Sequence, residues 1–351
     1  MDLNEEARPF VGAAVLRGFL PMLLLAAVLT IRPTAAYASA PTVIPVGKAV
    51  GIKLFSDGVV VVGTSEIATD GGSVNPAKAC GLKEGDIITH INSTEVDTIE
   101  EVSALLQELE GEAMSIRAIR DDKQVQFTAQ AALCASDGAY KLGAWIRDSM
   151  AGIGTVTFYC PDTGAFGALG HGINDTDTAL LMPLDSGSIL PATVAGVEKG
   201  QAGDPGQLQG VFDTDSTLGL LHANTSGGVF GVVSDRSWVE GTSVEVAQRD
   251  EVQPGEAKIL CNISGDRVEE YTIQIAKVFA EQKDDSRDYL IKVTDQRLLD
   301  TTGGIVQGMS GSPILQNGKI VGAVTHVLVD DPTSGYGIYV GRMLQQCDNR
   351  E

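Results

Sequence analysis

The chain has 351 residues, enough for two or three folded units, and its 43% hydrophobic and 20% charged residues indicate a packed globular protein. A formal net charge of -21 repels phosphate backbones and argues against a nucleic-acid partner. The five cysteines are scattered and include no Cys-x-x-Cys pair, which argues against a zinc site and against a disulfide framework.

Residues 1–40 have the features of a secretion signal or a membrane anchor. Gly18 to Ile31 is an apolar run between Arg17 and Arg32, and Ala36-Tyr37-Ala38 resembles a signal-peptidase site. A cleaved signal and an uncleaved anchor are both open at this point. In either case we expect the bulk of the protein to work outside the cytoplasm, attached to or near a membrane.

Residues 45–132 predict a small α+β domain. Strands are expected at 50–54 and 59–62, then a helix at 98–110 with apolar residues at three- and four-residue spacing, then a hairpin at 115–129. The run from Ala77 to Ile88, which reads Ala-Lys-Ala-Cys-Gly-Leu-Lys-Glu-Gly-Asp-Ile-Ile, resembles the signature of PDZ domains. This resemblance implies a groove in which an extended peptide adds to a strand edge beside the helix. The implied groove residues are Val50, Gly51, Ile52 and Leu54 on the strand, and Ile99 and Val102 on the helix.

Residues 138–351 predict a mainly β unit. Short runs rich in Val, Ile and Thr are broken by Gly, Asp, Asn and Pro, and no long amphipathic helix is evident. A unit of this length and pattern fits two β-barrels or a pair of sandwiches.

The strongest chemical signal is Gly308-Met309-Ser310-Gly311-Ser312-Pro313. A nucleophilic serine requires an exposed tight turn, and the flanking glycines permit unusual backbone angles and close substrate approach. A strand, an Asn-Gly turn and a second strand follow, which is a hairpin rather than the helix of an α/β-hydrolase. The pattern therefore matches a chymotrypsin-type peptidase, with the amides of Gly308 and Ser310 as the oxyanion hole. Ser312 is the competing nucleophile.

A serine nucleophile needs a base and an acid that orients it. Among His90, His171, His222 and His326, we prefer His171, because small residues flank it and leave room for substrate, and it precedes Ser310 by a long interval. Five carboxylates remain open for the third position: Asp175, Asp177, Asp213, Asp215 and Asp295.

The chain resembles the SpoIVB family of sporulation serine peptidases along nearly its whole length. The resemblance is carried by residues 303–313, 322–327 and 331–337, by Ile146-Arg147-Asp148-Ser149 with Gly152-Ile153-Gly154-Thr155, and by residues 167–171. It implies His171 and Ser310 as catalytic residues, with Asp295 as the acid. Members of this family are secreted into the space between the forespore membranes, cleave themselves and then a membrane-bound regulator of an intramembrane protease, and so activate a sigma factor.

We therefore expect an N-terminal anchor or signal, an α+β PDZ-like domain, and a chymotrypsin-like double β-barrel peptidase that needs no metal or cofactor. The expected partners are peptide substrates, including the chain itself, a membrane-bound regulatory protein, and the membrane through the N-terminal segment. The alternative is a catalytically silent PDZ scaffold at a membrane.

Overall fold

The computed structural model describes residues 41–280 and 286–348, and within them the chain is mainly β, as predicted. The predicted signal or anchor in residues 1–40 lies outside the described residues. Within the described ranges, no helix is long and apolar enough to cross a membrane.

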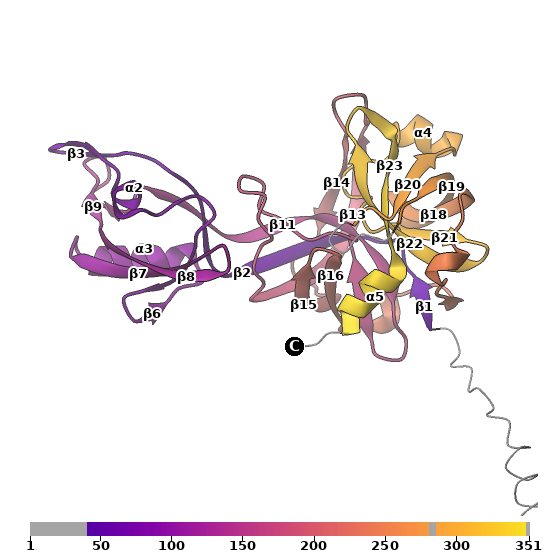
Figure 1. Ribbon diagram of the computed structural model, residues 1–351, viewed down its shortest axis with the longest axis horizontal. Helices are drawn as coiled ribbons and strands as arrows, with labels where there is room; N and C mark the ends of the chain where they lie inside the picture. The colour runs from indigo at the N-terminus through magenta and orange to yellow at the C-terminus, as the bar shows by residue number, and fades with distance from the viewer. Residues whose placement is uncertain (1–40, 281–285, 349–351) are drawn as a thin grey trace, which may run out of the picture. The chain divides into compact units, whose positions relative to one another are not determined.

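Six strands pair edge to edge and form a closed ring. The pairings run from β11 through β12, β16, β15, β13 and β2, and β2 pairs with β11 again (Figure 1). β1, β14 and β17 extend this sheet at its sides. The bounds are β1 Thr42–Pro45, β2 Ala49–Thr64, β11 Ala144–Tyr159, β12 Ala165–Ala168, β13 Ser186–Glu198, β14 Gln207–Phe212, β15 Gly219–Thr225, β16 Gly228–Val233 and β17 Val244–Glu245.

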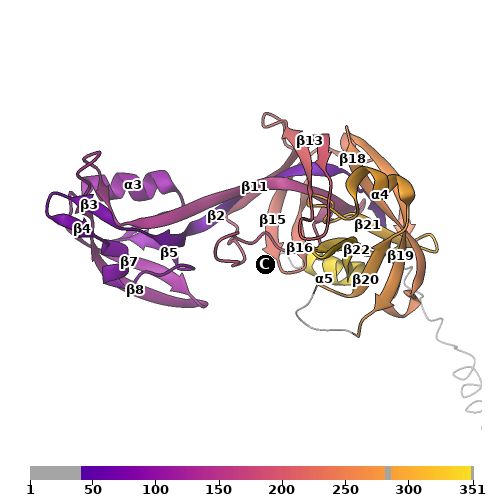
Figure 2. The ribbon, with the colours of Figure 1, turned by 90° about the horizontal axis from the view of Figure 1, so that it is seen from above.

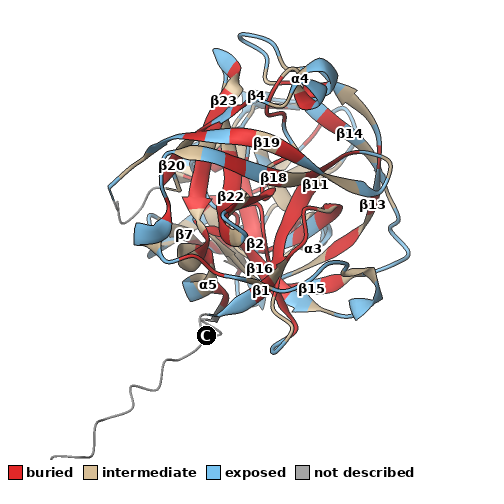
Figure 3. Ribbon diagram, turned by 90° about the vertical axis from the view of Figure 1, so that its right-hand side faces the viewer, coloured by how far each residue is buried: buried red, intermediate tan, exposed pale blue. Residues whose placement is uncertain are grey.

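The later part of the chain forms a closed barrel in the order β18, β19, β20, β23, β22 and β21. Ile259, Ile273, Ile291 and Val324 are at most 1% exposed, and Figure 3 shows buried residues in red along the barrel strands. The bounds are β18 Gly255–Ser264, β19 Arg267–Val278, β20 Tyr289–Val293, β21 Pro313–Gln316, β22 Lys319–Leu328 and β23 Asp331–Tyr339, with the helices η1 Arg236–Trp238, η2 Arg249–Glu251, α4 Gln296–Thr302 and α5 Val340–Asp348.

The hairpin predicted after Pro313 is confirmed. β21 and β22 pair antiparallel, and Asn317 and Gly318 between them have φ of 52° and 78°. Two consecutive positive φ angles define the hairpin turn for which Asn-Gly is the preferred sequence.

The PDZ-like unit has its own core and is built between the far ends of β2 and β11. Its helix α3 begins at a capping box in which Thr98 and Glu101 bond each other's backbone amides. Arg120 anchors the buried carboxylate of Asp86 at 2.6 Å. The bounds are β3 Ile67–Thr69, β4 Gly72–Val74, α2 Pro76–Cys80, β5 Ile87–Ile91, β6 Thr94–Glu95, α3 Ile99–Glu108, β7 Ala113–Arg120, β8 Lys123–Gln130, β9 Ala132–Leu133 and β10 Tyr140–Lys141.

The structure corrects the predicted groove strand. Val50, Gly51, Ile52 and Leu54 belong to the half of β2 that lies in the first ring, where β11 pairs with one edge and β13 with the other (Figure 2). A peptide cannot add to a strand whose two edges are both hydrogen-bonded. The peptidase part of the chain therefore also includes residues 41–54, far ahead of the boundary expected at residue 138.

Candidate active site

Ser310 lies on a tight turn between the two strand systems. Thr155 of β11 holds this turn at two points, because its amide donates to the Ser310 carbonyl at 3.1 Å and its hydroxyl donates to the Gly308 carbonyl at 2.8 Å. Gly311 has a φ of 96°, and a Cβ there would collide with the Thr155 carbonyl. The glycine is thus required both by its backbone angle and by the close approach of β11.

Two backbone amides of this turn are candidates for an oxyanion hole. The amides of Met309, Gly311 and Ser312 donate to the carbonyls of Val306, Val324 and Met309. Those of Gly308 and Ser310 have no acceptor among the residues the structure describes. Unpaired, preorganised amides beside a nucleophile are what a developing oxyanion needs. The sequence predicted these two amides as the oxyanion hole, and that role stays a prediction.

Ser312, the competing nucleophile, is fully buried. It is 0% exposed, and its hydroxyl has no hydrogen-bond partner within the described part of the chain. Ser310, by contrast, is half-buried and lines a pocket. A substrate carbonyl can therefore reach Ser310 but not Ser312.

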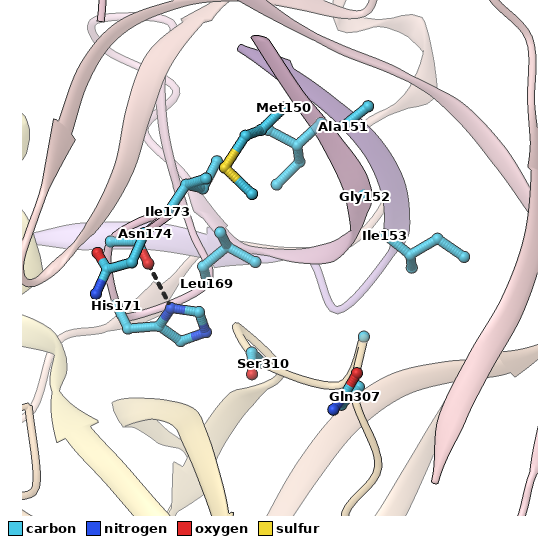
Figure 4. Close-up of a pocket in the computed structure, with 13 residues that line it drawn as sticks. Met150, Ala151, Gly152, Ile153, Leu169, His171, Ile173, Asn174, Gln307 and Ser310 are labelled. Atoms are coloured by element: carbon cyan, nitrogen blue, oxygen red, sulfur yellow. Dashed lines mark hydrogen bonds between the residues drawn. The ribbon is translucent and has the colours of Figure 1, made fainter. Parts of the chain in front are cut away.

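His171 faces the same pocket as Ser310, from the end of β12 (Figure 4). Leu169 and Gly170 before it have φ of 67° and 72°, so the chain turns sharply as it leaves the strand. The His171 Nδ1 lies 2.8 Å from the Gly172 carbonyl. That bond fixes the proton on Nδ1 and leaves Nε2 as the acceptor. Burial lowers the pKa of His171 below its ordinary value, partly opposed by the bond to Gly172, which favours the neutral imidazole that a general base must present.

The Ser310 hydroxyl adopts a resting arrangement. Its Oγ donates to the Thr325 carbonyl at 2.6 Å. The acceptor of the hydroxyl proton is thus a backbone oxygen of β22 and not His171. Catalytic hydrogen bonds often form only when substrate is bound.

The other three histidines have different surroundings. The His326 ring, next to Thr325, lies with its centroid 5.1 Å from that of His171. His222 is exposed on β15, and His90 contacts Thr89 in the PDZ-like unit at 3.1 Å. Of the four histidines, only His171 lines the Ser310 pocket.

The carboxylate of Asp295 caps helix α4. It accepts from the Arg297 amide at 3.0 Å, pairs with the Arg297 guanidinium at 3.0 Å, and accepts from the Thr272 amide at 3.3 Å. Hydrogen bonds from Arg297 hold the pKa of Asp295 below its usual range. Asp295 does not line the pocket of Ser310 and His171. Its role as the catalytic acid stays a prediction.

Three of the four remaining candidate acids have partners for their carboxylates. Asp175 and Asp177 both pair with Arg147, while Asp213 accepts from Ser216 and from the Asp215 amide. Asp175 is buried in the loop that follows His171, so Arg147 of β11 secures that loop.

Asn224 holds the same loop at a second place, and sequence reasoning missed it. Its Oδ1 accepts from the Ile173 amide at 2.8 Å, and its Nδ2 donates to the carbonyls of Ile173 and Met182, each at 2.9 Å. No sequence signal marked Asn224. Arg147 and Thr155 did stand in the motifs that carried the family resemblance, but without an assigned role.

A second pocket, of about 560 Å³, lies in the PDZ-like unit. The predicted helix residues Ile99 and Val102 line it, together with Leu106. The strand beside the helix is the start of β11, at Ala144 to Ile146, whose described pairings are all to β2. This edge remains open, so the groove exists with a different strand from the one predicted.

No group of three or more His, Cys, Asp or Glu side chains that could hold a metal ion occurs in residues 41–280 and 286–348.

Two family models match the chain. The model described as SpoIVB peptidase S55 matches residues 138–344, more than half of the chain, and the one described as PDZ domain matches residues 73–120. Among curated proteins, the zinc metalloprotease RasP of Shouchella clausii (strain KSM-K16) is 38% identical over 66 residues, which is 19% of this chain. The chain spans 16% of the length of that relative.

Similar solved structures include proteases and a PDZ domain. The active form of the Rv3671c protease from M. tuberculosis aligns with a TM-score of 0.33 and 15% identity over 57% of this chain and 73% of that one. The HtrA-type protease AlgW with decapeptide aligns with a TM-score of 0.35 and 9% identity over 87% of this chain and 65% of that one. The PDZ domain of an SdrC-like protein from Listeria monocytogenes aligns with a TM-score of 0.21 and 23% identity over 26% of this chain and 87% of that one.

Proposed function

Since the chain belongs to the SpoIVB peptidase S55 family and is a serine peptidase, we propose that Ser310 is its nucleophile and His171 its general base. The observation that carries this assignment is one pocket lined by both side chains, beside two amides that have no acceptor in the described structure. Among the residues that line this pocket, Ser310 is the only serine and His171 the only histidine.

The mechanism follows from these positions. Ser310 turns from the Thr325 carbonyl toward Nε2 of His171, which takes the hydroxyl proton as Oγ attacks the substrate carbonyl. The oxyanion accepts from the amides of Gly308 and Ser310. His171 then donates the proton to the leaving amine, and water hydrolyses the acyl-enzyme by the reverse sequence. The pair of six-stranded rings supports the chymotrypsin-like double β-barrel expected for this chemistry.

The third member of the triad is proposed to be Asp295, on the family resemblance alone. In the structure, the Gly172 carbonyl accepts from His171 and can itself set the tautomer. Replacing Asp295 by Asn removes the charge and keeps one acceptor oxygen, which can still cap the Arg297 amide, while the bond from the Thr272 amide to the second oxygen is lost. A triad acid predicts a large loss of kcat, whereas a helix cap alone predicts a small loss of stability with kcat retained.

We further propose that the substrates are the chain itself and a membrane-bound regulator of an intramembrane protease, cleaved in the space between the forespore membranes as a step toward sigma-factor activation. The PDZ groove beside α3 supports recognition of an extended segment, because the edge of β11 at Ala144 to Ile146 is open to a further strand. The membrane association expected from residues 1–40 belongs to the same proposal.

Self-cleavage of the purified full chain tests the proposed nucleophile. Fragments are followed by gel electrophoresis and their ends identified by mass spectrometry, for the wild type, Ser310→Ala and the matched control Ser312→Ala. We expect Ser310→Ala to stay intact and Ser312→Ala to be processed normally, because the Ser312 hydroxyl is buried without a partner. Processing that persists in Ser310→Ala would leave the silent PDZ scaffold as the better description, and inactivity of Ser312→Ala alone would transfer the role to that residue.

A further inference from the structure

The pocket beside Ser310 is large enough for a substrate side chain and apolar along most of its wall. Its volume is about 300 Å³. The apolar wall comes from six side chains: Ile52, Met150, Ala151, Ile153, Leu169 and Ile173. Met150, Ile153 and Ile173 are only half-buried, so they present apolar surface that nothing in the described structure covers (Figure 4).

The lining contains no charged partner for a substrate. Besides the apolar residues it includes Asn174, Gln307 and backbone glycines, and its one titratable side chain is His171. A charged substrate side chain would lose its hydration there without gaining an ion pair, which is costly. An aliphatic side chain would gain by leaving water.

Ile153 gives this wall a fixed shape. A Cβ on Gly308 would lie 3.2 Å from the Ile153 Cγ2, and one on Gly210 would lie 2.5 Å from its Cδ1. The isoleucine therefore fits between two glycine backbones, one of which belongs to the oxyanion hole. A rigid wall discriminates by size better than a mobile one.

The positions of the lining residues indicate which side of the scissile bond the pocket serves. They come from β2, from β11, from the segment around His171 and from the turn before Ser310. β22, whose Thr325 carbonyl accepts the Ser310 hydroxyl, contributes no described residue to the lining. The acyl group stays on Ser310, while the leaving amine must lie within reach of His171. The pocket is therefore on the leaving-group side.

Resting on the proposed peptidase function, we propose that this pocket selects substrates with a medium-sized aliphatic side chain, such as Leu, Ile, Val or Met, at the first or second residue after the cleaved bond. One methylene in an apolar pocket discriminates by about 10- to 200-fold in general, and Leu exceeds Ala by three carbons, so we expect kcat/KM to favour Leu over Ala at that position by at least about 10-fold. Asp and Lys should be disfavoured at least as strongly as Ala.

The test is a digest of a synthetic peptide library by the full chain, with cleavage sites read by mass spectrometry, followed by kcat/KM for peptides that carry Leu, Ala, Asp or Lys at the selected position. Met150→Lys places a cation in the pocket wall and should raise the ratio of Asp-peptide to Leu-peptide cleavage at least tenfold. Leu220→Lys, at an exposed leucine outside the lining, is the matched control and should leave the ratio unchanged.

The results separate this inference from the proposed function. Three outcomes of Ser310-dependent cleavage overturn the inference and leave the peptidase assignment intact. These are no aliphatic preference after the cleaved bond, a preference only before it, and an unaltered ratio of Asp-peptide to Leu-peptide cleavage in Met150→Lys. Cleavage that survives Ser310→Ala overturns the peptidase assignment instead. Should no library peptide be cleaved, binding of fluorescent Leu and Asp peptides to Ser310→Ala decides, and equal affinities overturn the inference.

Discussion

Removing the Asn224 side chain should weaken catalysis more than it weakens the fold. Asn224 lies on β15 and does not line the pocket, but its amide joins both sides of the loop that follows His171 through the Ile173 and Met182 backbones. Asn224→Ala leaves these three backbone groups without a side-chain partner. The ion pair of Arg147 with Asp175 then still holds the loop after His171 from another element of the fold.

The magnitude follows from the three bonds. A typical hydrogen bond contributes about 0.5–1.5 kcal/mol net, so three bonds bound the loss at about 4.5 kcal/mol, and because Asn224 is half-buried, water can replace part of it. We expect about 2 kcal/mol of lost stability. A displacement of a catalytic group by about 1 Å costs on the order of 100-fold in rate, so kcat should fall roughly 10- to 100-fold.

The matched control is Gln316→Ala. The Gln316 amide also makes three backbone bonds, with the Gln253 amide at 3.1 Å, the Gln253 carbonyl at 2.9 Å and the Glu256 carbonyl at 3.2 Å. These tie Gln253 and the start of β18 to β21 and involve no residue of the pocket lining. Urea unfolding gives the stability of each variant, and kcat and KM are measured on one fluorogenic peptide.

Gln316→Ala should lose at least as much stability as Asn224→Ala, because Gln316 is buried, but only Asn224→Ala should lose kcat at a temperature where both are folded. Equal kcat losses in the two variants would refute the reasoning, because they would show a general effect of destabilisation. An unchanged kcat in Asn224→Ala would refute it as well, since the loop would then hold His171 without this amide.

Three further outcomes follow from the same contacts. Burial lowers the pKa of His171, and a general base must be neutral, so kcat/KM should stay high as the pH falls through about 6.5 and drop only below it. A fall of kcat/KM that is centred at or above about pH 6.5 would contradict the assignment of His171 as the base. Thr155→Val keeps the shape of the side chain but loses its hydrogen bond to the Gly308 carbonyl, so kcat should fall about tenfold with little change in KM. An unaltered kcat would show that the turn at Gly308 to Ser310 keeps its conformation without this bond. Arg147→Ala leaves the buried Asp175 carboxylate without its cation. Because Arg147 is itself partly exposed, the free energy of unfolding measured in urea should fall by about 1–3 kcal/mol. A change in that free energy within experimental error would contradict this expectation.

The nucleophile turn could be predicted because its determinants are local. Glycines around Ser310, the proline after it and the Asn-Gly turn at 317–318 each constrain the chain within a few residues, and the structure confirms the hairpin that they imply. The choice of His171 rested on small neighbours, and the structure places it across the pocket from Ser310.

The groove strand could not be predicted because strand partners are not local. Val50 to Leu54 and Ala144 to Ile146 both read as apolar strand sequence, and which one lies beside α3 depends on pairings between residues about 90 positions apart. Asn224 was missed for the same reason, since its three partners are 42 and 51 residues away.

The route of β2 and β11 makes the peptidase a discontinuous domain with the PDZ-like unit as an insertion. The chain leaves the first ring near Phe55 and re-enters it near Ser149, and these two residues face each other across the ladder. A fragment beginning at residue 138 would lack β2, open the ring and lose Ile52 from the pocket wall. Excision of the insert with a short turn joining Phe55 to Ser149 would instead preserve every strand of the ring. The two units are therefore separable by loop replacement but not by truncation.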